Sequence, residues 1–334
     1  MMNCRSTANA GTIRTVARRL AAVLTLAVAA MLPAAAAAQE YPNRPIRMLV
    51  GFSAGGGVDA LARTLSTRLS EQLGQNVVVE NRPGATSTIA ANLLVSSPPD
   101  GYTVFLADSS LLIAARAMQN LSFDPLTSFA PVAGIATAPL AIAVAAGSPL
   151  RTLEEMAAAS KTKPLNYATS GIGTVHHLAV EHLLSRAEIQ MTHLPYRGAS
   201  QLLPDLISGQ VDLAVLSAAA AIGQVQAGKI RVLGLTSPDK LDGAADWRAI
   251  ADWLPGFDAS PRLFVLAPSG TPPAVVGRLE TELGKAMNDP ALSQNLSKQG
   301  FITAFRTGPQ LRIGMEEELG RWTALIQKSG IVLK

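Results

Sequence analysis

Short apolar runs alternate with stretches of helical periodicity along the chain, and this alternation limits the possible folds more than any other feature. Residues 46–50 are apolar and are followed by three glycines at 55–57. Leucines then recur at every fourth position as far as Gly74, a residue suited to end a helix. Further apolar runs follow at 77–79 and 102–107. This order of strand, helix and strand is typical of a parallel sheet with crossover helices.

The same rhythm continues toward the carboxyl end. More strands are predicted at 140–145, 165–168, 191–195, 211–216, 230–236 and 263–267. Helices are predicted after Thr152, after Thr271-Pro272, and over 311–326, where apolar residues recur at helical spacing. These units are more than one compact sheet needs. We therefore predict an α/β fold of two lobes, type II-like, each a mainly parallel sheet flanked by helices, with a ligand cleft between them.

The lobes need not be continuous in sequence. We expect residues 39–140 to form the first part of lobe 1 and residues 141–257 to form lobe 2. The strand at 263–267 most simply rejoins the first sheet, so residues 258–334 are expected to complete lobe 1.

Residues 1–38 have the three parts of a secretory signal peptide. Four arginines and no acid surround the start of an apolar run from Leu20 to Leu32, and the segment ends in Ala36-Ala37-Ala38. The run is too short for a membrane anchor. We expect cleavage after Ala38 and export of the remaining chain; a retained N-terminal helix is the alternative.

Loss of this segment changes the charge balance. Of 28 basic residues four lie in it, so the remainder carries 24 basic against 24 acidic residues and no net charge. Cys4, the single cysteine, is lost as well, so the fold must depend on a hydrophobic core rather than on disulfides. Hydrophobic residues at 48% exclude a disordered chain, and aromatics at 4% argue against a nucleic-acid binder.

Two glycine-containing loops lead from a predicted strand into a predicted helix. The first is residues 51–59, GFSAGGGVD, and the second is residues 169–174, TSGIGT. Glycine lets backbone N–H groups approach a ligand, and a helix N-terminus adds partial positive charge, so such loops suit a carboxylate. One loop in each proposed lobe favours an acid held from both sides. A nucleotide is less well supported, because the third glycine of a dinucleotide motif and the Gly-Lys-Ser/Thr of a phosphate loop are both missing.

The segment Gly51–Gly55 also fits the G-x-S-x-G pattern of a hydrolase, so a secreted serine esterase using Ser53 is the alternative function. The segment follows the first predicted strand, which leaves no upstream sheet for an oxyanion loop. All four histidines lie between 176 and 193, and none lies in the last third of the chain. We therefore expect no catalytic residue.

His177 and Glu181 are four residues apart and could share a hydrogen bond or a metal on one helical face. The three ligands of a usual zinc site and the H-E-x-x-H motif are missing, so a structural role is favoured over a metal site.

With these residues in view, the chain resembles the substrate-binding receptors of tripartite tricarboxylate transporters, the Bug or TctC-type family. The resemblance covers nearly the whole mature chain. Its motifs are Tyr41-Pro42-Asn43-Arg44-Pro45-Ile46, Val79-Glu80-Asn81-Arg82-Pro83-Gly84-Ala85, Pro99-Asp100-Gly101-Tyr102-Thr103, Pro195-Tyr196-Arg197-Gly198, Gly209-Gln210-Val211-Asp212 and Ala267-Pro268-Ser269-Gly270-Thr271-Pro272, in addition to the two glycine loops.

The resemblance implies a periplasmic two-lobed receptor that closes on a small carboxylated solute such as a di- or tricarboxylate or an amino acid. From the motifs we expect no cofactor and no metal. Expected partners are membrane permease subunits or the periplasmic domain of a sensor kinase, not nucleic acid, and we expect a monomer. The expected ligand-binding residues are Phe52, Ser53, Ala54, Gly55, Gly56, Asp59, Ser109, Thr169, Ser170, Gly171, Gly173, Thr174, His177, Tyr196 and Asp212.

The chain also departs from the family pattern. Thr86-Ser87 replaces glycines that commonly follow Gly84-Ala85, and Arg262 lies beside the predicted lobe junction. We hypothesise that Arg262 faces the cleft and pairs with a second ligand carboxylate; a surface arginine is the alternative. A purely structural cell-envelope protein is disfavoured by the paired glycine loops.

Overall fold

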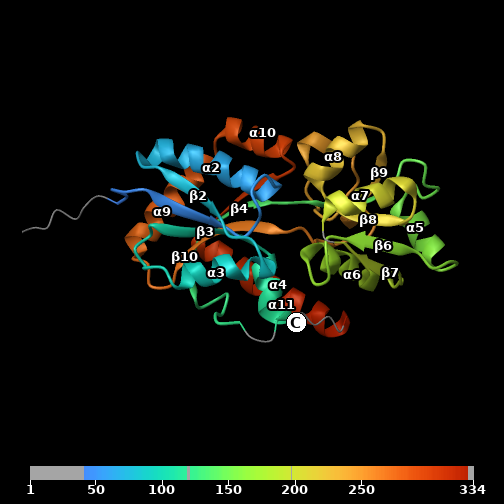
Figure 1. Cartoon of the computed structure of the whole chain (residues 1–334), viewed down its shortest axis with the longest axis horizontal. Helices are drawn as coiled ribbons and strands as arrows, with labels where there is room; N and C mark the ends of the chain where they lie inside the picture. The colour runs from blue at the N-terminus through green and yellow to red at the C-terminus, as the bar shows by residue number, and fades with distance from the viewer. Residues whose placement is uncertain (1–40, 119–120, 197, 330–334) are drawn as a thin grey trace, which may run out of the picture. The chain divides into compact units, whose positions relative to one another are not determined.

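The computed structural model describes residues 41–118, 121–196 and 198–329 (Figure 1). The signal peptide expected at residues 1–38 and Arg197 lie outside the described residues. The chain divides into two units, residues 1–43 and 44–334, and the description that follows concerns the second unit.

A six-stranded sheet carries the first glycine loop. Its strands occur in the order β11, β4, β10, β3, β1, β2. Their bounds are β1 Ile46–Val50, β2 Val77–Asn81, β3 Thr103–Asp108, β4 Phe129–Thr137, β10 Arg262–Pro268 and β11 Ile302–Thr307. The strand expected at 263–267 therefore does join the sheet that begins the chain.

A five-stranded sheet carries the second glycine loop. Its strands occur in the order β7, β6, β8, β5, β9. Their bounds are β5 Leu140–Ala145, β6 Asn166–Thr169, β7 Thr192–Pro195, β8 Leu213–Ser217 and β9 Ile230–Leu235. Each sheet with its helices makes one lobe, so the two-lobed α/β fold is confirmed. The sequence ranges that we assigned to the lobes stay a prediction.

The sheets are mixed, and our expectation that each is mainly parallel was wrong. Strand β1 pairs in parallel with β2 and β3, and β6 pairs in parallel with β7 and β8. The pairs of β10 with β3 and β4, of β11 with β4, and of β5 with β8 and β9 are antiparallel. The reason is that β4 leads across Ala138-Pro139 into β5 without a crossover helix, and β10 returns from the other sheet.

Helices cover both faces of each sheet (Figure 1). Those of the first lobe are α2 Gly57–Leu73, α3 Thr88–Val95, α4 Ser110–Ala117, α9 Pro273–Met287, α10 Pro290–Lys298 and α11 Gly308–Ser329. Those of the second lobe are α5 Leu153–Ser160, α6 Val175–Ala187, α7 Ala199–Ser208 and α8 Ala218–Gln226. Short 3₁₀ turns occur at Ala85–Ser87, Asp242–Ala244 and Ile250–Asp252.

Local signals set several helix ends. Gly74 adopts φ 65° after α2, a left-handed conformation that glycine takes without strain. The Thr152 hydroxyl accepts a hydrogen bond from the Glu155 N–H and caps α5, as its position in the sequence predicts. No described helix is long and apolar enough to cross a membrane.

The last helix, α11, contacts helices of both lobes. It packs on α4 of the first lobe and on α6 of the second. Trp322 near its end is fully buried in a cluster that also contains Phe105 of β3 and Tyr167 of β6. One hydrophobic core therefore continues from one lobe into the other on the α11 side.

Candidate functional site

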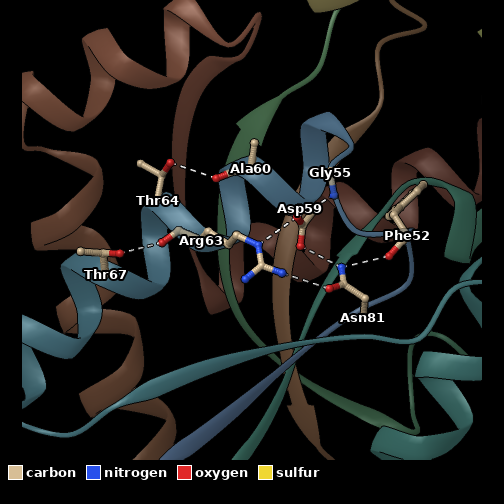
Figure 2. Close-up of polar contacts among 8 residues, drawn as sticks. All are labelled: Phe52, Gly55, Asp59, Ala60, Arg63, Thr64, Thr67 and Asn81. Carbon is tan, nitrogen blue, oxygen red and sulfur yellow. Dashed lines mark hydrogen bonds and ion pairs between the residues drawn. The ribbon is translucent and has the colours of Figure 1, made fainter.

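The first glycine loop, residues 51–56, connects β1 to α2. The Asp59 side chain holds it in place through hydrogen bonds (Figure 2). Asp59 is 3% exposed. Asp59 Oδ2 accepts hydrogen bonds from the Gly55 N–H and from Arg63 Nε, both at 2.9 Å. Asp59 Oδ1 accepts one at 2.9 Å from Asn81 Nδ2, which also donates to the Phe52 carbonyl oxygen at 3.1 Å. We call Asp59, Arg63 and Asn81 the loop frame.

Within the loop frame the positive charge of Arg63 offsets the negative charge of Asp59. The hydrogen bond from Arg63 is the main cause that lowers the pKa of Asp59 from 3.8 to about 2, and burial opposes it. Asp59 is therefore ionised at neutral pH and neutralised by Arg63. Its oxygens accept hydrogen bonds from the loop and its frame, so this residue positions the loop, and its expected contact with a ligand stays a prediction.

The start of α2 supplies hydrogen-bond donors beside this loop. Gly56 precedes the helix with φ −82° and ψ 170°, and no side chain caps the first turn. The N–H groups of the first turn of a helix have no partner within the helix, and the helix dipole places partial positive charge there. This arrangement can hold a carboxylate without a basic side chain.

A strained turn packs against the loop from the carboxyl side of β2. Ala85, Thr86 and Ser87 all have positive φ, at 44°, 54° and 69°. Ser87 is 2% exposed and packs so closely on Gly51 that a Cβ at Gly51 would lie 2.4 Å from Ser87 Oγ. Glycine adopts positive φ without strain, whereas this turn contains a β-branched threonine.

The second glycine loop follows β6 and begins α6. The Thr174 hydroxyl caps the helix by accepting from the His177 N–H at 3.3 Å, and it donates to the Gly171 carbonyl at 2.9 Å. The Gly173 N–H donates to His177 Nδ1 at 3.0 Å. Of the residues expected to bind ligand, His177 thus orients the loop and occupies one of its N–H groups.

An aromatic stack supports the second loop. The His177 and His193 rings stack 3.8 Å apart, and Tyr167 stacks on His193 at 4.9 Å. His193 Nε2 lies 2.7 Å from the Thr169 hydroxyl, and the Tyr167 hydroxyl donates to Glu181 Oε1 at 2.5 Å. Burial lowers the pKa of His177 and of His193 to about 4, so both rings are neutral at pH 7.

Glu181 does not act together with His177 as a metal or proton pair. His177 Nε2 and Glu181 Oε1 are 3.8 Å apart, beyond hydrogen-bond distance. Among the described residues no group of three His, Cys, Asp or Glu side chains is arranged to hold a metal ion.

Two expected ligand contacts, Ser109 and Arg262, lie together where β3 ends and β10 begins, at the same edge of the sheet as the first glycine loop. The pairing of β3 with β10 places the Arg262 N–H 2.8 Å from Ser109 Oγ, and the Ser109 side chain is fully buried. The Arg262 guanidinium forms an ion pair with Asp258 and lines a pocket beneath α11 with Glu318.

Tyr196 and Asp212 also bond within the protein. The Tyr196 N–H donates to the Thr169 carbonyl, which keeps Tyr196 beside the second loop, and its hydroxyl donates to Asp205 at 2.6 Å. Asp212 accepts from the Asn166 N–H at the amino ends of β6 and β8. The second loop follows the carboxyl end of β6, so the structure does not bring Asp212 to it.

The sequence pattern did not identify Arg63, Asn81 and Ser87 as parts of the site. A signal for Asn81 did exist, because it ends the strand beside β1 and the carboxyl ends of parallel neighbours meet at one edge.

Comparisons with known proteins agree with this geometry. The family model described as tripartite tricarboxylate transporter family receptor matches residues 61–331. A UPF0065 protein in the tcbD-tcbE intergenic region of Pseudomonas sp. (strain P51) is 35% identical, with 92% of this chain and 93% of the relative covered.

Similar solved structures are binding proteins. The periplasmic binding protein BugD is 28% identical with a TM-score of 0.75, covering 88% of this chain and 100% of that one. Rpa4515 of R. palustris with adipate is 29% identical (TM-score 0.78; 88% and 99% covered). MatC of Rhodopseudomonas palustris with bound malate is 26% identical (TM-score 0.73; 86% and 100% covered).

The family and these neighbours are solute-binding receptors rather than enzymes, which removes the esterase alternative. The geometry agrees, since His176, His177 and His182 lie on α6 and His193 on β7 of the second sheet, and no described histidine hydrogen-bonds to Ser53. The match over residues 61–331, together with a relative at 35% identity, means that the chain belongs to the tripartite tricarboxylate transporter receptor family.

Proposed function

We propose that the protein is an exported receptor that binds a small dicarboxylate in the periplasm and presents it to a tripartite transporter or to a sensor domain. The observation that carries this is the loop frame. It fixes the first glycine loop with Asp59, whose charge Arg63 already neutralises. The first-turn N–H groups of α2 can then donate hydrogen bonds to a bound anion.

A dicarboxylate suits two loops better than a monocarboxylate. One loop in each lobe begins a helix, so each can take one carboxylate through backbone N–H groups. The bound adipate and malate of two similar structures are both dicarboxylates. The proposed contacts are the loop residues 52–56, together with residues 169–174 as positioned by His177 and Tyr196.

Closure of the lobes is the proposed response. A ligand that touches both lobes has a higher affinity for the closed arrangement and shifts the population toward it. The lobes in this proposal are residues 39–140 with 258–334, and residues 141–257.

A thermal-shift and calorimetric screen of the purified mature chain tests the proposal. Adipate, malate and succinate are compared with hexanoate, which carries one carboxylate, at equal ionic strength. Saturable binding and a raised melting temperature with a dicarboxylate, but not with hexanoate, are expected, because a ligand of the native state stabilises it. Equal responses to hexanoate would contradict the two-carboxylate reasoning, and no response to any acid would contradict the function.

The variant Gly57→Pro locates the binding. Gly57 is the first residue of α2, a position where proline is well tolerated, and the preceding Gly56 already has the extended backbone that a following proline requires. The change removes one N–H group, and we expect at least tenfold weaker dicarboxylate binding with an unchanged melting temperature in the absence of ligand. Pro290→Ala, at the first position of α10, is the matched control and should bind like the unmodified protein.

A further inference from the structure

A pocket lies between α11 and the face of the six-stranded sheet that this helix covers. Its volume is about 130 Å³, room for several waters or one small oxyanion. Three arginines line it, Arg262 from β10, Arg306 from β11 and Arg321 from α11, against two acids, Glu317 and Glu318. We call this space the α11 pocket; it shares no lining residue with either glycine loop.

Arg306 reaches the pocket through a break in the sheet. The register of β11 against β4 shifts between Thr303 and Arg306. Two glycines leave space for the arginine side chain. A Cβ on Gly134 would lie 3.1 Å from Arg306 Cβ, and a Cβ on Gly314 would lie 3.4 Å from Arg306 Nη1. The side chain thus lies beside β4 and α11 while it stays exposed to solvent.

Arg306 is exposed to solvent and brings a charge that no acid of the described chain pairs with. Within the described chain Arg306 forms no ion pair, whereas Arg262 is paired with Asp258. An arginine at a lined pocket with no acid within ion-pair distance is available to an external anion.

Arg321 adds an unused donor. Its Nε is buried from solvent, yet it has no hydrogen-bond partner. Its Nη2 forms a loose ion pair with Glu318 Oε1 at 3.9 Å, a distance too long for a hydrogen bond. Leaving a buried charged donor without a partner is costly, so an acceptor at this place would be stabilising.

The acids of the pocket oppose an anion only weakly. Glu318 is 6% exposed and already accepts a hydrogen bond from Trp322 Nε1 at 3.0 Å. Burial raises the pKa of Glu318, with hydrogen bonds from Ser109 and Trp322 acting in the opposite direction. Glu317 is exposed to solvent, which screens its charge.

We propose that the α11 pocket is a second binding site, for a small oxyanion of the carboxylate or phosphate class, held between Arg306 and Arg321. Guanidinium groups bind both oxyanions through paired N–H···O hydrogen bonds. The site is next to the segments that connect the lobes, since Arg262 pairs with Thr137 at the end of β4 and the Ala138 N–H donates to the Pro261 carbonyl. The proposal does not depend on the proposed function of the glycine loops.

Calorimetric titration of the purified protein with inorganic phosphate, and separately with succinate, tests the site at constant ionic strength. We expect saturable binding of at least one of the two. Arg306→Gln should weaken it at least tenfold. Gly314→Leu should do the same by filling the space beside Arg306, and it should fold well because it replaces a glycine within a helix.

Two control variants separate this site from other binding. Arg116→Gln changes an exposed arginine that does not line the pocket and should leave the affinity unchanged. Gly57→Pro should also leave it unchanged, whereas an anion bound by the first glycine loop would be lost. Phosphate binding alone identifies a phosphate site, and persistence of succinate binding in Gly57→Pro identifies a site that also accepts carboxylates. The proposal would be overturned if neither anion shows saturable binding to Gly57→Pro, or if the binding that remains in Gly57→Pro survives the addition of Arg306→Gln and of Gly314→Leu.

Discussion

Replacement of Asp59 by asparagine should destabilise the protein in a pH-dependent way. The variant keeps the size of the side chain, but its amide nitrogen cannot accept the hydrogen bonds that Gly55 and Arg63 now donate to Asp59 Oδ2. The first glycine loop then loses its fixed position over α2, so dicarboxylate affinity should fall together with stability.

The pKa shift of Asp59 gives the magnitude. A fall from 3.8 to about 2 corresponds to at most about 2.5 kcal/mol, since one pKa unit is about 1.4 kcal/mol. The Arg63 side chain is 56% exposed, so solvent screens its share, and the expected loss at pH 7 is about 1–2 kcal/mol. A carboxylate with a lowered pKa stabilises the protein above pH 3.8, and this contribution is lost as the pH falls through about 2.

Urea unfolding of the two proteins at pH 7 and at pH 3 measures this difference. The deficit of Asp59→Asn should be full at pH 7 and clearly smaller at pH 3. Asp239→Asn, which changes an exposed acid, is the control and should unfold like the unmodified protein at both pH values. An Asp59→Asn deficit that is zero at pH 7, or equal at both pH values, would refute the reasoning.

Three further changes have defined outcomes. Gly300→Val should lower the free energy of unfolding by about 2–3 kcal/mol, because Gly300 has φ 84° and a Cβ there would lie 2.6 Å from the Ala219 backbone nitrogen. Gly256→Ala, at φ 77° with open surroundings, should lower it by only about 1 kcal/mol. Equal losses in chemical unfolding would argue against the close approach at Gly300. Trp322→Ala should cost about 3–5 kcal/mol, since the side chain is fully buried; a loss under 1 kcal/mol would show that α11 does not anchor the core. The melting temperature should drop as the pH falls from 6.5 toward 4, because burial lowers the pKa of His193 to about 4 and His193 is protonated first in the unfolded chain. His193→Asn should reduce the dependence of the melting temperature on pH, and an unchanged dependence would contradict a neutral, buried His193.

Elements with strong local signals could be predicted from the sequence. The apolar run at β1, the leucine spacing of α2 and the glycine at its end gave the right element types in the right order. Strand β11 escaped notice because Ile302–Thr307 is half-exposed and shows neither alternation nor a continuous apolar run. The prediction of mainly parallel strands failed for a different reason. Whether two strands run parallel depends on the path of the chain between them, and β10 pairs with β4 across more than a hundred residues.

The candidate site could be located but not resolved into roles. Glycine loops before helices can be recognised in a sequence, whereas the groups that donate hydrogen bonds to a given carboxylate cannot. Asp59 was predicted as a ligand contact, but the hydrogen bonds that it accepts from Asn81, 22 residues away, and from Arg63 could not be read from the sequence. Arg262 was expected to face a cleft on the strength of its position near a junction. The structure shows that Arg262 pairs with Asp258, four residues earlier, and lines the pocket beneath α11, a pairing that a linear pattern does not single out.

The order of strands in the six-stranded sheet has a consequence for biosynthesis. Strand β10 is inserted between β3 and β4, and the other neighbour of β4 is β11, so β4 pairs only with strands made near the end of translation. A nascent chain that has passed residue 137 but not residue 262 carries β3 and β4 with unpaired backbone edges. Such edges pair readily with other chains. The growing polypeptide therefore has a long aggregation-prone interval, about a third of its length, during which a chaperone that shields open strand edges would raise the yield of folded receptor.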